Sequence, residues 1–199
     1  PNGAEPLVPL SAVHLLGDHL LSDVVAATAV AHRVGVSAGA MTAAVDRFPG
    51  LEHALEPVGE VAGVRFINDS KATNVEAARR ALESCGRQLV VIMGGRFKGG
   101  DLGALAPLLA SRADAVVVLG EARDRILDAY GAVVRVVEVE SLRDAVSVAY
   151  GLASHGGTVL LAPACASLDM FEDYAERGRL FKQAVGRLRE DVRTRARTS

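Results

Sequence analysis

The chain has 199 residues, 50% of them hydrophobic, and a formal net charge of −2. That length allows one good core and part of a second, and the small charge provides no global field to attract nucleic acid or a membrane. The two cysteines are far apart and outside any CxxC pattern, which predicts a reduced cytoplasmic protein without disulfides or zinc. No apolar run reaches the roughly 20 residues that a membrane span needs, so no membrane anchor is predicted.

Two helix-like stretches, residues 19–33 and 37–47, occupy the first part of the chain, and Pro49-Gly50 ends it. No strand alternates with these helices, so we interpret residues 1–50 as the end of a preceding domain. Because the chain begins with proline rather than methionine and shows no charged-then-apolar leader, we expect a fragment of a longer protein without a targeting signal.

Beyond residue 63, apolar runs of strand length alternate with helix candidates in a second predicted domain, 51–199, which residues 51–63 link to the first. The runs at 90–92 and 116–119 are apolar on both faces, as expected for strands covered by helices on both sides. The alternation predicts an α/β fold with a doubly wound, mostly parallel sheet. The predicted strands are residues 64–67, 89–93, 115–119, 133–137 and 158–161. The predicted helices are residues 75–83, 102–111, 122–130, 141–153 and 171–188.

Three of the segments that leave these strands are rich in Gly, Lys, Asp, Ser or Thr: residues 68–74, 94–101 and 162–169. Right-handed crossovers place the carboxyl ends of parallel strands along one edge of the sheet, and ligands of open α/β sheets bind beyond that edge. The sequence therefore predicts a ligand site where these three segments meet.

The first segment is the most informative. Residues 67–74 read Ile-Asn-Asp-Ser-Lys-Ala-Thr-Asn between a predicted strand and a predicted helix. Capping of the helix accounts for one or two of these polar side chains, but not for all of them. We interpret the octet as part of a ligand site, with Lys71 offering charge to an anion and Asp69 accepting hydrogen bonds from hydroxyl groups.

The second segment, residues 94–101, reads Gly-Gly-Arg-Phe-Lys-Gly-Gly-Asp. Paired glycines allow a backbone to approach a ligand closely and to adopt positive φ angles, and Lys98 adds a positive charge. The pattern matches neither GxGxxG nor GxxxxGK[ST], so dinucleotide binding and a P-loop are excluded by spacing. Glycine-rich turns also simply connect strands to helices, and this alternative stays open for the segment taken alone.

The third segment, residues 162–169, consists mainly of small residues that permit close packing. Ser167 or Asp169 could cap the following helix, whose exposed amides would suit a carboxylate. Cys165 lies among alanines without a base nearby in sequence, so we interpret it as a buried small residue rather than a nucleophile. The five histidines form no HxxxH or HExxH group, and no metal site is predicted.

The octet INDSKATN, the loop GGRFKGGD and the run APACASLDMFEDYAERG resemble, in this order, the C-terminal domain of the D-glutamate-adding ligases of the Mur ligase family, the UDP-N-acetylmuramoyl-L-alanine:D-glutamate ligases. The resemblance covers residues 48–185, and residues 10–47 more loosely as the end of the family's central ATPase domain. Sister ligases carry Asp-Tyr-Ala-His or Asp-Asp-Ser-Tyr sequences at the octet, and folylpolyglutamate synthases carry Asp-Gly-Ala-His. The first motif is therefore specific.

The resemblance implies ATP- and Mg²⁺-dependent amide formation in peptidoglycan biosynthesis, through an acyl phosphate of UDP-N-acetylmuramoyl-L-alanine that the amine of D-glutamate attacks. It assigns Lys71 to the reaction centre near the phosphates. It assigns the D-glutamate carboxylates to Thr73, Lys98, Ser167 and the backbone of Leu168, with Tyr174 packed near that amino acid. It assigns nucleotide contacts to Asn68, Asp69 and His53, with Asp69 accepting from the ribose.

The chain also departs from the family pattern. Leu20 and Asp23 stand where the family has asparagines, and Ala54 where it has an arginine, so the resemblance supplies no adenine contact or phosphate-neighbouring cation at these positions. With no P-loop, carbamylated-lysine segment or UDP-binding domain, the chain alone is expected to be an inactive, monomeric fragment, and ATP and Mg²⁺ are expected mainly on the missing central domain. One alternative is a free-standing binding module of the same fold. Another, a nicotinamide-dependent enzyme, is disfavoured by the glycine spacing.

Overall fold

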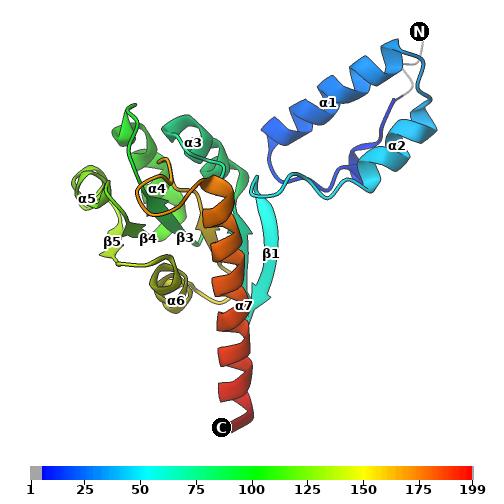
Figure 1. The fold of residues 1–199 in the computed structure, drawn as a ribbon. Helices are drawn as coiled ribbons and strands as arrows, with labels where there is room; N and C mark the ends of the chain where they lie inside the picture. Colours follow the sequence, from blue (N-terminus) through cyan, green and yellow to red (C-terminus); the bar gives the residue numbers. More distant parts are fainter. Residues whose placement is uncertain (1–5, 199) are drawn as a thin grey trace. The chain divides into compact units, whose positions relative to one another are not determined.

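The computed structural model describes residues 6–198, and the chain divides into two compact units, Pro1–Leu51 and Glu52–Ser199. The first unit contains the 3₁₀ helix η1 (Leu10–Ala12) and the helices α1 (Asp18–Arg33) and α2 (Ala38–Asp46) (Figure 1). Both predicted helices are therefore confirmed. The side chain of Ser37 caps α2 by accepting a hydrogen bond from the backbone amide of Ala40 (3.3 Å), as expected for a serine before a helix.

The second unit is built on a six-stranded sheet in the order β1-β2-β6-β3-β4-β5. All neighbouring strands are parallel except β1 and β2, which are antiparallel. The doubly wound, mostly parallel sheet predicted from the sequence is thus confirmed. The strands are β1 (Glu56–Val61), β2 (Val64–Asn68), β3 (Leu89–Gly94), β4 (Ala113–Leu119), β5 (Arg135–Glu138) and β6 (Thr158–Leu161).

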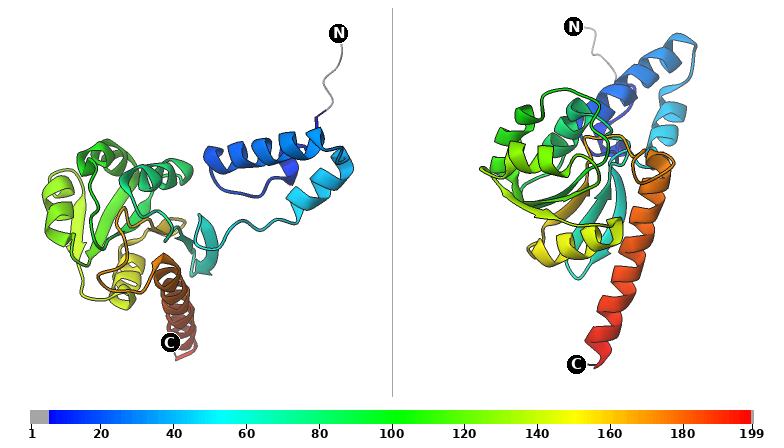
Figure 2. Two further views of the ribbon diagram at one scale, coloured as in Figure 1. Left: turned by 45° about the horizontal axis from the view of Figure 1, so that its top comes forward. Right: turned by 60° about the vertical axis from the view of Figure 1, so that its left-hand side comes forward.

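Helices cover both faces of this sheet (Figures 1 and 2). On one face, α6 and α7 share a core with the strands, in which the rings of Phe66 on β2 and Phe181 on α7 lie 6.4 Å apart. The helices α3, α4 and α5 pack on the other face, so the central strands β3 and β6 are buried throughout. The helical elements are α3 (Val75–Ser84), η2 (Leu102–Leu105), α4 (Ala106–Arg112), α5 (Arg123–Tyr130), α6 (Leu142–Leu152) and α7 (Tyr174–Thr198).

Residues 51–63, expected to lead into the second domain, contain β1, a strand that the sequence did not predict and that forms the antiparallel edge of the sheet. The sequence of β1, Glu-Pro-Val-Gly-Glu-Val, contains proline and glycine, and the pairing register shifts between Pro57 and Gly59. Proline and glycine are tolerated at edges and bulges and not in central strands. The usual strand signal is therefore weak at an edge that still completes the sheet.

Two helix boundaries also differ from prediction. The helix expected at 102–111 is divided into η2 and α4, and Pro107 lies at the first turn of α4, where its missing N–H costs no hydrogen bond. The last helix begins at Tyr174 and continues to Thr198, later and farther than the predicted 171–188. No helix in the described part of the chain combines the length and apolar character that crossing a membrane requires.

Candidate functional site

The three polar segments meet at the carboxyl edge of the sheet, as predicted. We call them the β2 loop (residues 68–74), the β3 loop (94–101) and the β6 loop (162–169). The backbone amide of Ala164 donates to the carbonyl of Ala72 (3.0 Å), which joins the β6 and β2 loops. Arg96 and Ala166 exchange two backbone hydrogen bonds of 2.8 and 2.9 Å, which join the β3 and β6 loops. Because β6 lies between β2 and β3, the three loops form one contiguous surface.

The paired glycines of the β3 loop are needed for packing between loops. Gly94 and Gly95 have φ angles of 125° and 120°, a region that side chains rarely adopt. A Cβ atom at Gly94 would collide with the backbone of Leu119, and one at Gly95 would collide with the carbonyl of Ala166. These glycines therefore let the ends of β3, β4 and β6 approach closely, in addition to any role in admitting a ligand.

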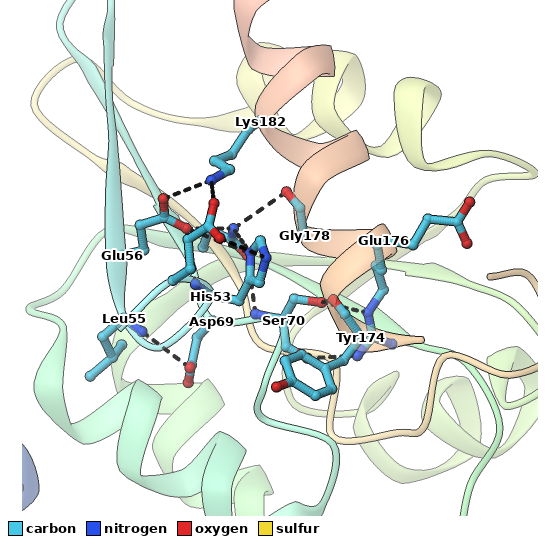
Figure 3. A network of polar contacts seen from close by, with 12 residues as sticks. His53, Leu55, Glu56, Asp69, Ser70, Tyr174, Glu176, Gly178 and Lys182 are labelled. Carbon is cyan, nitrogen blue, oxygen red and sulfur yellow. Dashed lines mark hydrogen bonds and ion pairs between the residues drawn. The ribbon is translucent and has the colours of Figure 1, made fainter. Parts of the chain in front are cut away.

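Asn68, at the end of β2, is fully buried and uses its side-chain amide to organise the β2 loop. Figure 3 shows four residues that this amide contacts: His53, Glu56, Ser70 and Gly178. Its Nδ2 donates to Glu56 Oε2 (3.0 Å) and to the carbonyl of Gly178 (3.3 Å), and lies 2.9 Å from His53 Nδ1. Its Oδ1 accepts from the amide of Ser70 (3.1 Å). Since these contacts are all internal, Asn68 shapes the loop; its assignment to nucleotide binding stays a prediction.

His53 is the buried centre of the same network. Its backbone has a φ of 64°, and its carbonyl accepts from the amide of Lys71 (3.0 Å). The ring lies edge-on to Tyr174, with 6.3 Å between ring centroids, and a Cβ atom at Gly178 would collide with it. Burial lowers the pKa of His53, although the carboxylate of Glu52 acts in the opposite direction. The assignment of His53 to nucleotide binding stays a prediction.

Asp69 presents a carboxyl group that is almost completely buried. Its Oδ1 accepts a hydrogen bond from the amide of Leu55 (3.1 Å). Burial raises the pKa of Asp69 to about 6, against the opposing effects of the Leu55 hydrogen bond and the charge of Lys71. The predicted ribose acceptor therefore changes its protonation state near pH 6, whereas an exposed aspartate does so near pH 4.

Asp69→Asn is expected to remove a pH dependence of folding stability. Because the pKa of Asp69 is raised in the folded state, the protonated carboxyl stabilises the fold below about pH 4, and this stabilisation is lost as the pH rises to about 6. Asparagine keeps an acceptor for Leu55 but does not titrate. In urea unfolding, the free energy of unfolding of the variant relative to the wild type should be higher at pH 7.5 than at pH 4.5, by on the order of 1–2 kcal/mol. The same difference at both pH values would contradict this.

The cap of α3 is provided by Asn74, whose Oδ1 accepts from the amide of Ala77 (2.8 Å). Capping thus leaves Lys71 and Thr73 unexplained. Lys71 is exposed and Thr73 is half-buried, and within residues 6–198 neither side chain forms a hydrogen bond or an ion pair. Both are therefore available to a ligand at the edge where the loops meet.

Lys98 is exposed on the β3 loop. Among the described residues its ammonium forms no ion pair, but its charge reaches the β6 loop. Burial raises the pKa of the Cys165 thiol to about 11, and the positive charges of Arg177 and Lys98 act in the opposite direction. The interpretation of Cys165 as a buried small residue is confirmed, because its thiol is inaccessible and held protonated.

The β6 loop leads into α7 and carries the remaining predicted residues. Ser167 is buried, whereas Leu168 is 59% exposed and Tyr174 39% exposed. Leu168 also lines a cleft of about 480 Å³. These two exposed apolar side chains give the edge a surface on which the aliphatic part of a ligand can pack. The residues lining this cleft are Arg96, Gly120, Glu121, Arg123, Glu140, Leu168, Asp169 and Met170.

The expectation that Ser167 or Asp169 caps the last helix is wrong. The Oδ1 atom of Asp173 accepts from the amide of Glu176 (2.6 Å), and Glu176 Oε2 accepts from the amide of Glu172 (2.6 Å). An Asp-x-x-Glu pair before a helix is a recognisable capping signal, and the sequence contains it at 173–176. Asp169 instead accepts from the amide of Glu121 (2.9 Å) and joins the β6 loop to the end of β4.

Sequence reasoning assigned no role to Arg177, which is one of the largest fully buried side chains of the described chain. It ends the run APACASLDMFEDYAERG together with Gly178, but a helical arginine gives no sign of burial in sequence. Its guanidinium donates to the β2 and β6 loops. Within residues 6–198, no group of three or more His, Cys, Asp or Glu side chains is placed to hold a metal ion.

Comparisons with known proteins indicate one family for this chain. Residues 55–165 match the family described as the Mur ligase, glutamate ligase domain. A UDP-N-acetylmuramoylalanine--D-glutamate ligase of Acidobacterium capsulatum is 46% identical over 181 residues, 91% of this chain and 39% of the relative. One from Chlorobium luteolum is 48% identical over 172 residues, 86% of this chain and 37% of the relative. The chain thus spans about two fifths of the length of the curated relatives it matches.

Solved structures share the fold at lower sequence identity. A UDP-N-acetylmuramate-alanine ligase of Thermotoga maritima has a TM-score of 0.67 and 20% identity, and the match covers 90% of this chain and 40% of that protein. A folylpolyglutamate synthase of Mycobacterium tuberculosis has a TM-score of 0.65 and 20% identity, with 86% of this chain and 41% of that protein covered.

Proposed function

The chain belongs to the Mur ligase family, as a glutamate ligase domain, and from this we propose that it is the amino-acid-binding part of a ligase that adds D-glutamate to UDP-N-acetylmuramoyl-L-alanine. The observation that carries the proposal is the edge where the β2, β3 and β6 loops meet. There, Lys71, Thr73 and Lys98 have no side-chain partners within the described chain. Relatives with this name that are 42–48% identical to the chain support D-glutamate as the amino acid.

In the proposed reaction, the terminal phosphoryl group of ATP is transferred to the carboxylate of UDP-N-acetylmuramoyl-L-alanine, and ADP leaves. The amine of D-glutamate then attacks the carbonyl carbon of this acyl phosphate. The C–N bond of the amide forms, the C–O bond to phosphate breaks, and inorganic phosphate and one amine proton are released. Lys98, Thr73, Ser167 and the backbone of Leu168 hold the carboxylates of D-glutamate. Lys71 stabilises the negative charge that develops during the attack.

The first unit, residues 1–51, is proposed to be the end of a central ATP-binding domain. No residue of α1 is buried, and its apolar side chains Val25 and Val30 are exposed, as is Val34 directly after the helix. These exposed side chains support packing against further protein. That domain would bind most of ATP and Mg²⁺, and Asn68, Asp69 and His53 are proposed as further contacts to the nucleotide. The enzyme is proposed to act as a cytoplasmic monomer on small molecules.

The proposed function predicts a strict dependence on D-glutamate. The complete ligase, incubated with ATP, Mg²⁺ and UDP-N-acetylmuramoyl-L-alanine, should release inorganic phosphate when D-glutamate is added. L-Glutamate, D-alanyl-D-alanine and meso-diaminopimelate are matched alternatives and should give only background release. Phosphate release with one of these amino acids in preference to D-glutamate would assign the chain to another branch of the family.

A free-standing binding module of the same fold is the second candidate. This candidate is favoured by three replacements of residues that the family uses near the nucleotide: Leu20, Asp23 and Ala54. This candidate predicts D-glutamate binding without phosphate release by the complete gene product. D-Glutamate-dependent phosphate release excludes it.

A further inference from the structure

The guanidinium of Arg177 connects the loops of the proposed D-glutamate site from beneath. Arg177 lies in the first turn of α7 and is only 2% exposed. Its Nε donates to the hydroxyl of Ser70 (2.9 Å), and its Nη2 donates to the carbonyl of Ser70 (2.8 Å). Its Nη1 donates to the carbonyl of Cys165 (3.3 Å), with a longer contact to the carbonyl of Gly94 (3.5 Å). One side chain thus reaches the β2, β6 and β3 loops.

The first turn of α7 strengthens the connection to the β2 loop. The hydroxyl of Ser70 donates to the carbonyl of Tyr174 (2.7 Å) and at the same time accepts from Arg177. Ser70 is itself fully buried. The residues next to it in the loop are Asp69 and Lys71, so any shift of Arg177 is transmitted directly to side chains of the proposed site.

Arg177 also brings a positive charge that no anionic group in contact with it neutralises. All four of its acceptors are neutral oxygens, and among residues 6–198 no carboxylate lies within ion-pairing distance of it. Burial lowers the pKa of Arg177 to about 10, with Asp169 and Cys165 opposing this change. The side chain therefore remains charged at neutral pH. A buried charge without a charged partner is costly to folding, and its field is poorly screened by water.

We propose that Arg177 is a positioning residue for amino-acid binding: it fixes the spacing of the β2, β3 and β6 loops and places beneath the carboxylates of D-glutamate a positive charge that forms no ion pair within the described chain. The inference rests on the proposed function, because it names the substrate whose binding the residue supports. The planar fork of guanidinium donors is required, since a lysine ammonium is a compact charge that does not reach all these acceptors in the same geometry.

The chain offers a matched control for this arrangement. Arg112 also directs a guanidinium at backbone carbonyls, with Nη1 donating to Cys85 (2.9 Å) and lying 3.5 Å from the carbonyls of Leu82 and Glu83. It precedes β4 and contacts the segment before β3, at the amino edge of the sheet. Arg112 therefore has the same chemistry as Arg177, away from the proposed site.

The test compares Arg177→Lys and Arg177→Met with Arg112→Lys and Arg112→Met in the complete ligase. Arg177→Lys should raise the KM for D-glutamate about tenfold, with a smaller change in the KM for ATP, and Arg177→Met should raise it at least as much. The Arg112 variants should lower the melting temperature without separating the two KM values. Ser70→Ala, which removes one acceptor and keeps the charge, should raise the KM for D-glutamate in the same direction.

The inference is overturned if folded Arg177→Lys and Ser70→Ala enzymes keep the wild-type KM for D-glutamate, or if the KM values for D-glutamate and ATP rise equally. If Arg177→Met or Arg177→Lys does not fold, Ser70→Ala decides by the same criterion. A wild-type enzyme without D-glutamate-dependent phosphate release refutes the proposed function instead. An active wild-type enzyme whose variants are unchanged refutes only the role of Arg177.

Discussion

Lys71→Ala in the complete ligase is expected to lower kcat by about 100-fold or more. Lys71 is exposed at the edge of the sheet, and its ammonium forms no ion pair among the described residues. If it stabilises charge that develops as the amine attacks the acyl phosphate, its loss affects the transition state more than bound substrate, and kcat falls. Steady-state kinetics of purified Lys71→Ala and wild-type enzymes provide the measurement.

Two neighbouring residues serve as controls for Lys71. Thr73→Ala should mainly raise the KM for D-glutamate, because its proposed contact is made in the ground state. Asn74→Ala removes the cap of α3 and should cost roughly 0.5–2 kcal/mol of stability with little kinetic change. If Lys71→Ala behaves like Asn74→Ala, with lower melting temperature and intact kinetics, the β2 loop has only a structural role.

Lys98→Ala is expected to raise the KM for D-glutamate about tenfold or more, with a much smaller effect on the KM for ATP. A charged hydrogen bond between an ammonium and a carboxylate contributes roughly 1.5–3 kcal/mol. The exposed ammonium of Lys98 has no ion-pair partner among residues 6–198. A carboxylate of the ligand can therefore bind it without displacing a carboxylate of the protein. Initial-rate measurements with each substrate varied in turn give the two KM values.

Arg96→Ala is the matched control for Lys98. Arg96 is a cation on the same loop, but its Nε is paired with Glu121 Oε2 at 2.9 Å on the surface, and such pairs contribute little. The control should change neither KM appreciably. Equal increases in both KM values for Lys98→Ala, or the same effect from Arg96→Ala, would show that Lys98 is not a D-glutamate ligand.

The sequence predicts the central sheet well because burial leaves a direct signature there. Strands β3 and β6 are covered on both faces, and their continuous apolar runs distinguish them from the surrounding helices. Edge strand β1 lacks that signature, because only Val58 and Val61 among its six residues are apolar and the other four are glutamate, proline or glycine. It is held by pairing with β2, which is a long-range property that no local pattern reports.

The sequence likewise predicts some residues of the candidate site and misses others. Lys71 and Lys98 are recognisable because polar side chains after buried strands collect at one edge. Arg177 is not recognisable, because its acceptors on Ser70 and Gly94 are 107 and 83 residues away in sequence. For Asn68 the sequence predicts ligand binding, but in the structure its side-chain amide contacts His53 and accepts a hydrogen bond within the β2 loop.

A crystal structure of the complete ligase with bound D-glutamate tests the central claim most directly. The account predicts that the two carboxylates of D-glutamate lie between the β2, β3 and β6 loops, within hydrogen-bonding distance of Lys98 Nζ and of Ser167 or the backbone amide of Leu168. It also predicts that the D-glutamate amine points toward Lys71. D-Glutamate bound without contact to Lys98, Ser167 or Leu168, for example only between Phe97 and Arg125 beside α5, would contradict it.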